Sequence, residues 1–136
     1  MITAVDTSVL LDVFGADSTF GQRSREALRT CINQGRLVAC ELVWTEVATF
    51  FSPATDARVA LERLGCDFSA IDMDTALEAS KAWKAYRKQG GGRTRVAADF
   101  LIGAHALCQA DRLLTRDRGF YRSYFKRLTV LDPTVP

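Results

Sequence analysis

Short apolar runs alternate with longer helical patterns along this chain, and the alternation constrains the fold more than any other feature. The strand-sized runs lie at residues 2–5, 37–40, 113–114 and 128–131, with a candidate edge strand at 68–71. The helical patterns lie at residues 19–34, 42–51, 55–64, 74–89 and 96–110. Strands that alternate with helices favour right-handed crossovers and a sheet covered on both faces. We therefore expect an α/β fold, a three-layer α/β/α sandwich with a mostly parallel central sheet.

We expect a single domain that spans residues 1–136. The length is typical of one domain, and a composition of 48% hydrophobic and 25% charged residues disfavours disorder and small disulfide scaffolds. The longest charge-poor runs fall short of the roughly 18 to 20 residues that a membrane span needs. The N-terminus also lacks a basic flank ahead of an apolar stretch. These features predict a cytoplasmic protein that is not attached to a membrane.

Cysteine and histidine give no support for a zinc or redox site. The four cysteines contain no CxxC pair and are expected to be buried free thiols. They are Cys31, Cys40, Cys66 and Cys108. His105 is the only histidine, so a site built on imidazole ligands is excluded by counting. Its position six residues after Asp99 predicts a core or boundary residue rather than a catalytic base.

Isolated carboxylates are the strongest candidates for chemistry. Asp6, Glu46 and Asp99 are each the only charged residue in a window of 11 or more positions. An unpaired carboxylate in a core costs several kcal/mol, so each must be neutralised, paired with a base or bound to a metal. Taken singly, each could also be a helix cap or the partner of a distant arginine. Asp117 follows the apolar run 113–114, so it would leave the same rim of a parallel sheet as Asp6.

Together these acids favour a hard divalent cation. Clustered carboxylates repel one another unless a positive charge lies among them, and oxygen ligands select Mg²⁺ or Mn²⁺ over zinc. Ser8 and Thr115 add hydroxyl groups at the same rim. Residues 1–80 carry 6 basic and 12 acidic side chains, whereas residues 81–136 carry 12 and 4. Solvated helix faces can produce such an imbalance by chance, but an acidic metal centre in a basic surround suits phosphodiester chemistry.

Four motifs then occur in a recognisable order and spacing. They are VDTSVLLD at residues 5–12, Glu46, DFLIGA at residues 99–104 and LLTRD at residues 113–117. Over nearly the whole chain they resemble a PIN-domain ribonuclease of the VapC toxin type. The resemblance implies a catalytic quartet of Asp6, Glu46, Asp99 and Asp117. In such a quartet the three aspartates hold the metal, and the glutamate binds it or orients the attacking water. Ser8 and Thr115 match the supporting hydroxyl positions.

Three nearby positions require a choice. Glu41 is a second acid near Glu46, but it directly follows a strand and is expected to cap the next helix. Asp12 is expected to pair with an arginine rather than to touch the metal. Gly103 stands where alanine is common in the family, which should affect packing only.

The resemblance implies an endoribonuclease toxin that needs Mg²⁺ or Mn²⁺ and hydrolyses RNA phosphodiester bonds. It further implies a homodimer and a cognate antitoxin whose C-terminal segment fills the active-site groove. Four arginines near the Asp99 and Asp117 motifs are candidates for contacts to RNA phosphate, with simple solvated charge as the alternative for each. They are Arg93, Arg95, Arg116 and Arg118. The aromatic residues within 120–125 are expected to pack rather than to contact RNA. The two tryptophans, Trp44 and Trp83, are expected to pack or to lie in a dimer interface rather than to stack on RNA bases.

Other classes fit less well. A haloacid-dehalogenase-like phosphatase needs a second aspartate two residues after the first, where this chain has Ser8. The chain contains neither GxxxxGK nor GxGxxG, so a nucleotide-binding loop is excluded. The remaining alternative is a non-catalytic, metal-stabilised RNA-binding PIN-like module. Its signature would be the loss of one acid from the quartet, and all four are present here.

Overall fold

Five parallel strands form one sheet in the computed structural model, which describes residues 1–92, 95 and 97–135. The strand order is β3-β2-β1-β4-β5, and every neighbouring pair is parallel. The strands are β1 (Ile2–Val5), β2 (Arg36–Ala39), β3 (Cys66–Phe68), β4 (Arg112–Leu114) and β5 (Val130–Leu131). The parallel sheet expected from the sequence is confirmed.

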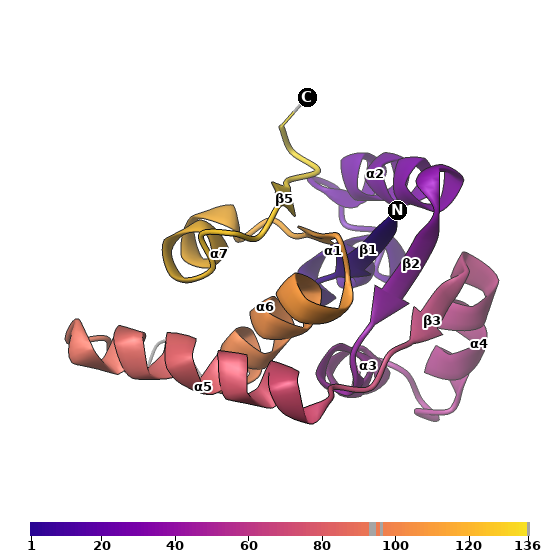
Figure 1. Cartoon of the computed structure of the whole chain (residues 1–136). Coiled ribbons are helices and arrows are strands. Elements are labelled where there is room, and N and C mark those ends of the chain that lie inside the picture. Colours follow the sequence, from indigo (N-terminus) through magenta and orange to yellow (C-terminus); the bar gives the residue numbers. More distant parts are fainter. Residues whose placement is uncertain (93–94, 96, 136) are drawn as a thin grey trace.

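Seven helices of the described ranges connect and cover these strands. They are α1 (Thr7–Phe14), α2 (Gly21–Gln34), α3 (Glu41–Ala48), α4 (Asp56–Leu64), α5 (Met73–Lys88), α6 (Ala97–Gln109) and α7 (Arg118–Tyr124). Figure 1 shows α5 and α6 on one side of the strands and α2 on the other, which is the expected three-layer arrangement. In the part of the chain that the structure describes, no helix combines the length and apolar character needed to cross a lipid bilayer.

Two short helices were not expected from the sequence pattern. Helix α1 begins directly after Asp6, whose side chain accepts a hydrogen bond from the Thr7 backbone and so caps the helix. Helix α7 covers only seven residues. The edge strand β3 lies at Cys66–Phe68 rather than at 68–71, because Gly65 ends α4 in the left-handed region with φ +82° and turns the chain at once into the strand.

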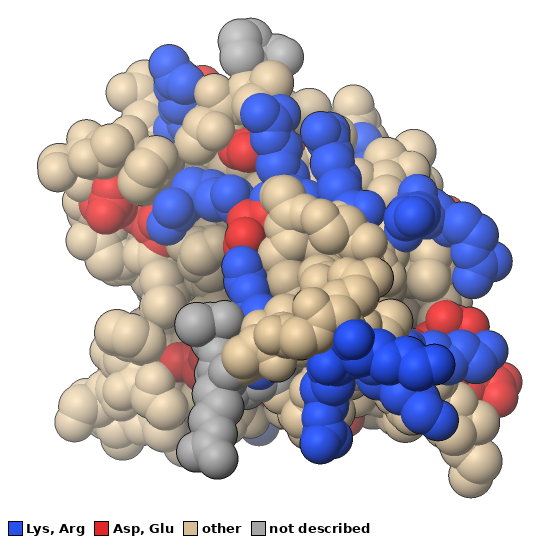
Figure 2. Space-filling model, turned by 90° about the vertical axis from the view of Figure 1, so that its left-hand side faces the viewer, with Lys and Arg blue, Asp and Glu red and all other residues tan. Residues whose placement is uncertain are grey.

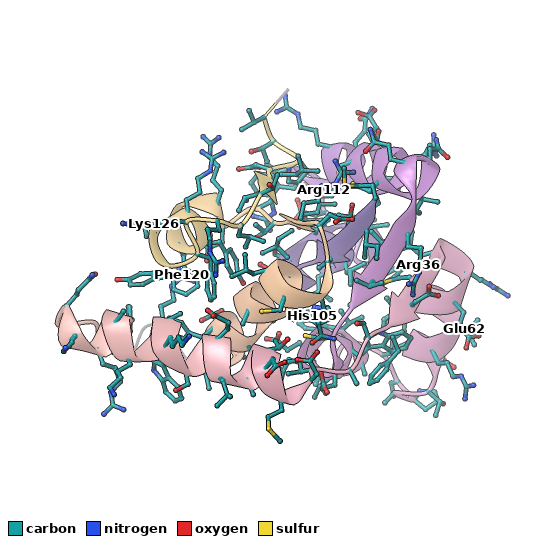
Figure 3. All side chains as sticks on the ribbon, viewed as in Figure 1. Arg36, Glu62, His105, Arg112, Phe120 and Lys126 are labelled. Atoms are coloured by element: carbon teal, nitrogen blue, oxygen red, sulfur yellow. The ribbon has the colours of Figure 1, made fainter. Side chains whose placement is uncertain are left out.

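The core lies between the sheet and the inner faces of the helices. His105 is buried, as expected, and its Nε2 lies 2.9 Å from Ser69 Oγ (Figure 3). All four cysteines are free thiols. The burial prediction is wrong for Cys108, which is exposed near the end of α6, and correct for the other three.

A glycine on α6 allows the aromatic residues of α7 to approach closely. A Cβ atom at Gly103 would lie 2.4 Å from Cε2 of Phe125, so any side chain there would overlap the ring. Phe100 of α6 packs edge-on against Phe120 of α7, with ring centroids 5.2 Å apart (Figure 3). Tyr124 joins the same cluster. The packing role predicted for these aromatic residues is confirmed, and α6 and α7 are held close to the end of β4.

Candidate active site at the carboxyl ends of β1 and β4

Asp6 lies at the centre of the candidate site. Strands β1 and β4 pair in register with Val5 opposite Leu114, and the residues that follow, Asp6 and Thr115, meet just beyond the sheet. Asp6 Oδ2 accepts a hydrogen bond from Thr115 Oγ1 at 2.7 Å, and Oδ1 accepts one from the Thr7 backbone N–H at 2.8 Å. The fold therefore holds a carboxylate where parallel sheets bind their ligands.

Burial raises the pKa of Asp6 above its ordinary value of 3.8. The residue is only 9% exposed, and desolvation disfavours its charged form. Hydrogen bonds from Thr115 and Thr7 act in the opposite direction, whereas the charges of Asp99 and Glu46 raise the pKa further. These two charges contribute least, so burial is the main cause of the raised pKa.

Thr7 connects Glu46 to Asp6. Its hydroxyl donates to Glu46 Oε1 at 2.8 Å while its backbone N–H donates to Asp6. Glu46 itself is exposed, which corrects the expectation from its apolar neighbours, because Val43 and Val47 point into the core and leave Glu46 on the outer side of α3. Thr7 was not among the residues predicted for the site. Its position next to Asp6 is the one feature of the sequence that could have indicated this role.

Thr115 connects Asp6 to Asp117, because its Oγ1 also accepts a hydrogen bond from the Asp117 backbone N–H at 3.0 Å. The Asp117 carboxylate forms a two-pronged ion pair with Arg95, in which Nη1 donates to Oδ2 and Nη2 donates to Oδ1 at 3.2 Å. The Arg95 guanidinium lies 4.2 Å from the centroid of the Phe120 ring. The hydrogen bond to Asp117 raises the pKa of Arg95. Arg95 is thus a fixed positive charge among the acids.

Tyr121 and Ser8 carry two further hydroxyl groups in the segments that follow β4 and β1. Tyr121 donates to Asp6 Oδ2 at 3.4 Å, and its pKa is raised well above the ordinary value by burial and then by the charge of Asp6. Tyr121 was expected only to pack, although its spacing of four residues from Asp117 places both on one face of a helix. The Ser8 Oγ atom is buried and has no hydrogen-bond partner within the described residues.

The donors at this rim suit a hard divalent cation in their chemistry. Carboxylate and hydroxyl oxygens are the ligands that Mg²⁺ and Mn²⁺ prefer, and the buried Ser8 Oγ is an unsatisfied polar atom of the kind that a bound ion or its water would satisfy. Among the described side chains, however, no group of three or more His, Cys, Asp or Glu is close enough to hold a metal ion. The acids are therefore gathered but spaced more widely than a closed metal site requires.

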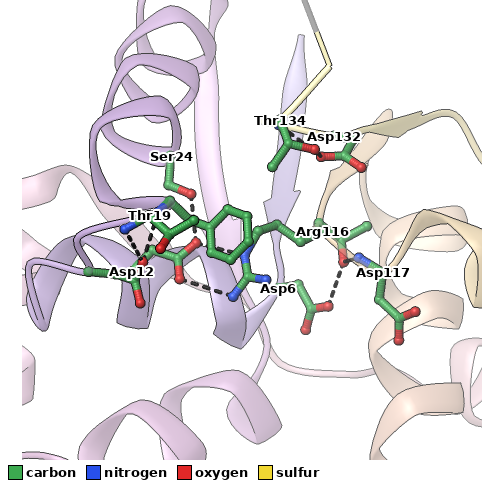
Figure 4. Close-up of polar contacts among 11 residues, drawn as sticks. Asp6, Asp12, Thr19, Ser24, Arg116, Asp117, Asp132 and Thr134 are labelled. Carbon is green, nitrogen blue, oxygen red and sulfur yellow. Dashed lines mark hydrogen bonds and ion pairs between the residues drawn. The ribbon is translucent and has the colours of Figure 1, made fainter.

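Asp12 and Arg116 form a separate, buried ion pair (Figure 4). Arg116 Nε donates to Asp12 Oδ2 at 2.8 Å and Nη2 donates to Oδ1 at 3.0 Å, while Ser24 Oγ donates to Oδ2 at 2.8 Å. The Arg116 guanidinium also lies over the Phe20 ring. Asp12 pairs with an arginine, as expected. The Arg116 guanidinium is thus held by Asp12 and the Phe20 ring, and its contact to RNA phosphate stays a prediction.

The remaining predicted residues are placed as follows. Arg118 Nε lies 3.7 Å from Asp132 Oδ2, and its side chain is 43% exposed, so it stays available for an anion. Arg93 lies outside the described residues.

Glu41 does not act as the cap of α3, because its carboxylate accepts a hydrogen bond from the Ile71 backbone N–H at 3.0 Å. The preference for Glu46 over Glu41 agrees with the contact to Thr7.

Basic side chains gather on the face formed by the free end of α5 and by α7 (Figure 2). Exposed members include Lys84, Arg87 and Lys88 on α5 and Arg122 on α7, followed by Lys126. A concentration of positive charge beside an acidic rim is the electrostatic pattern expected of a surface that meets an anionic polymer.

Comparisons with known proteins agree with this architecture. Residues 3–126 match the PIN domain family. No curated protein matches the chain. The structure is similar to VapBC2 from Rickettsia felis, solved with a promoter DNA fragment, with TM-score 0.76 and 13% identity over 97% of this chain and 98% of that one. It is also similar to VapBC-1 from nontypeable Haemophilus influenzae, with TM-score 0.74 and 20% identity over 98% and 99% of the two chains.

A third similar structure is VapC20 from Mycobacterium tuberculosis, described as a sarcin-ricin loop cleaving toxin. Its TM-score is 0.62 and its identity 16%, over 89% of this chain and 94% of that one. At such identities the likeness concerns the fold. The family match, in contrast, covers most of the sequence, including the segments that carry all four acids. The chain therefore belongs to the PIN-domain family.

Proposed function

We propose that this PIN-domain protein is an endoribonuclease that depends on Mg²⁺ or Mn²⁺ and acts as the toxin of a toxin–antitoxin pair. The observation that carries the proposal is the geometry around Asp6, a buried carboxylate beyond the end of β1 that is linked through Thr115 to Asp117 and through Thr7 to Glu46. Further support comes from the similar structures, which include VapBC and FitAB assemblies and a toxin that cleaves the sarcin-ricin loop.

Each acid has a defined part in this proposal. Asp6, Asp99 and Asp117 would hold the cation, and Glu46 would hold it or orient the attacking water. When bound, such a metal lowers the pKa of water and stabilises charge that develops at the phosphate. Thr7 fixes the Glu46 carboxylate by its hydrogen bond at 2.8 Å.

The hydroxyl groups and arginines complete the arrangement. Thr115 holds Asp6 in one orientation, and Tyr121 donates to the same oxygen from the side of α7. Arg95 and Arg118 supply positive charge for the substrate phosphate, which arginine recognises through paired hydrogen bonds.

The test is RNA cleavage by the purified protein with Mg²⁺, with Mn²⁺ or with EDTA, for the wild type and for Asp6→Asn and Asp99→Asn. We expect cleavage only with metal, and a loss of at least about 100-fold in each variant, since the substitutions remove charge where it stabilises the transition state. Asp74→Asn is the matched control, because Asp74 is exposed on α5. Cleavage that survives both EDTA and the Asp6 substitution would rule out the proposal.

The proposal includes two protein partners and a compartment. We propose a cognate antitoxin whose C-terminal segment occupies the acidic rim, a homodimer of this chain, and a cytoplasmic location. Inhibition of cleavage by the purified antitoxin, and sedimentation at the mass of two chains, are the expected results. Sedimentation as a monomer at high concentration would contradict the dimer.

A second candidate function is a non-catalytic, metal-stabilised RNA-binding PIN-like module. One observation favours it, namely that Arg95 already neutralises Asp117 by a two-pronged ion pair. In that case the wild type would bind RNA in Mg²⁺ or Mn²⁺ and the RNA would remain intact. The cleavage assay above therefore separates the two candidates.

A further inference from the structure

An exposed tryptophan and three cations share one stripe of α5. Side chains at helical spacing line an open cavity of about 790 Å³ there: Ser80, Trp83, Lys84, Arg87 and Lys88. Trp83 is 38% exposed, although its ring stacks on Phe100 at an interplanar angle of 16° and a centroid distance of 6.1 Å. The indole is thus held in place by the core while a large part of it faces solvent.

The positive charge of this stripe is not neutralised by the protein. Lys81 pairs with Glu78, but Lys84, Arg87 and Lys88 form no ion pair within the described part of the chain. All three are exposed, and Figure 2 shows basic side chains gathered over this end of α5. Unpaired cations beside an exposed aromatic ring are the combination that binds single-stranded nucleic acid.

A second cavity lies between the stripe and Arg95. Its volume is about 640 Å³, and its lining includes Trp83, Arg87, Arg95 and Ala97. Arg95, on the wall of this cavity, is paired with Asp117, so this arginine links the cavity to the acidic site. The volume lies within the range of about 300–1,000 Å³ typical of small-ligand pockets.

Hydrogen bonds and close packing hold the wall of this cavity in place. The Gly91 backbone N–H donates to the Tyr86 carbonyl at 2.9 Å, and the Tyr86 hydroxyl donates to the Gly92 carbonyl at 2.8 Å. A Cβ atom at Gly91 would lie 2.5 Å from Cε1 of Tyr86. Glycine therefore lets the chain lie directly against the tyrosine ring, and this contact shapes the pocket beside Trp83.

We propose that Trp83 and Arg87 form a subsite for one unpaired RNA nucleotide next to the phosphate that is cleaved. The base stacks on the exposed part of the Trp83 ring, and Arg87 binds the adjoining phosphate with help from Lys84. This inference rests on the proposed nuclease function and adds a residue pair that reads the substrate as single-stranded. It replaces the expectation that Trp83 only packs or lies in a dimer interface.

The first test uses fluorescence in EDTA, so that binding is measured without cleavage. The chain contains two tryptophans, and Trp44→Phe leaves Trp83 as the single reporter. Titration with a short single-stranded oligoadenylate should quench the Trp83 emission, whereas a duplex of the same length should not, because its bases are already stacked.

The second test measures RNA affinity by filter binding in EDTA. Trp83→Leu should weaken binding by about 5- to 150-fold, the effect of losing one base–aromatic stack, and Trp83→Phe should restore most of the affinity. Arg87→Gln should lower the slope of log affinity against log salt by about one. Arg63→Gln on α4 is the charge-matched control and should change neither quantity.

Two results would overturn the inference. One is an unchanged RNA affinity in Trp83→Leu and Arg87→Gln. The other is a change in oligomeric state or antitoxin affinity in these variants with no change in RNA affinity, since the surface would then be a protein interface. Failure of the nuclease proposal has a different signature, in which oligoadenylate quenches Trp83 normally but the wild type cleaves no RNA.

Discussion

Asp12 and Asp117 are both paired with arginines, but their surroundings differ. The Asp12 side chain is 5% exposed, whereas the Asp117 side chain is 41% exposed. A nearly buried carboxylate cannot give up its arginine without leaving a buried charge unpaired, while a half-exposed carboxylate can exchange its arginine for water or another cation. The first pair therefore belongs to the scaffold that joins α1 to the end of β4, and the second can take part in binding.

The Asp12→Asn substitution tests the scaffold role. It leaves the Arg116 guanidinium without its anion and should lower the free energy of unfolding by about 3 kcal/mol, the lower end for breaking a buried pair, because the Arg116 side chain keeps 29% exposure. Urea unfolding followed by circular dichroism measures the loss. Arg36→Gln is the control, since its ion pair with Asp67 is exposed on both sides and should cost less than about 1 kcal/mol. Equal losses in the two variants would contradict this distinction.

The Arg95→Gln substitution tests the exchangeable pair. Removing the cation that neutralises Asp117 should increase Mg²⁺ affinity by about fivefold, a modest gain because both side chains are partly exposed. Isothermal titration calorimetry gives the dissociation constant for Mg²⁺ directly. Arg118→Gln removes the same charge from a residue that faces Asp132 and should have a smaller effect. A fall in Mg²⁺ affinity in Arg95→Gln would show that Arg95 supports the site rather than competing for it.

At the scale of elements, the contact between α6 and α7 depends on the absence of one side chain. Gly103→Ala would place Cβ at 2.4 Å from the Phe125 ring, which is enclosed by the core at 3% exposure. We expect a loss of about 1–3 kcal/mol of stability, as for overpacked cores. Gly119→Ala is the matched control, because a Cβ there meets no atom within 4 Å and alanine favours the helix. Thermal unfolding distinguishes them, and a neutral Gly103→Ala would mean that Phe125 can move aside.

The elements also show which parts of the fold were accessible from the sequence. Long periodic segments such as α2 and α5 were predicted within two residues at each end, because their apolar spacing and terminal glycines or caps act locally. Helix α1 was missed because it covers only eight residues and begins directly after a strand, which leaves a short segment in which to recognise a helical period. The acids at strand ends were found for a simple reason, since a lone charge in an apolar segment is visible in one dimension. Hydrogen bonds between distant segments, such as Thr7 to Glu46 or Tyr121 to Asp6, were not predicted. They depend on how the folded helices are placed against one another, which a linear pattern does not show.

Across the whole molecule, the sheet separates two functions by charge. Its carboxyl edge carries Asp6 and Asp117, which follow β1 and β4, and the acids of α3 and α6. The helices α5 and α7 carry the cations. Burial disfavours the charged form of Asp6, and the charges of Asp99 and Glu46 add to this effect, so its pKa is raised. A bound cation relieves the repulsion, so metal binding and folding are coupled through the same group.

This coupling predicts a pH dependence with a definite sign. With its pKa raised in the folded state, Asp6 binds protons more tightly there than in the unfolded chain, so the metal-free protein loses stability as pH rises from the ordinary value of 3.8 through the raised pKa. Mg²⁺ binds the ionised carboxylates and offsets that loss. The rise in unfolding temperature caused by saturating Mg²⁺ should therefore grow between about pH 4 and pH 8 and should be smaller in Asp99→Asn at every pH. Scanning calorimetry with Mg²⁺ and with EDTA measures both curves, and a rise that stays constant over this range would mean that Asp6 is not part of the metal site.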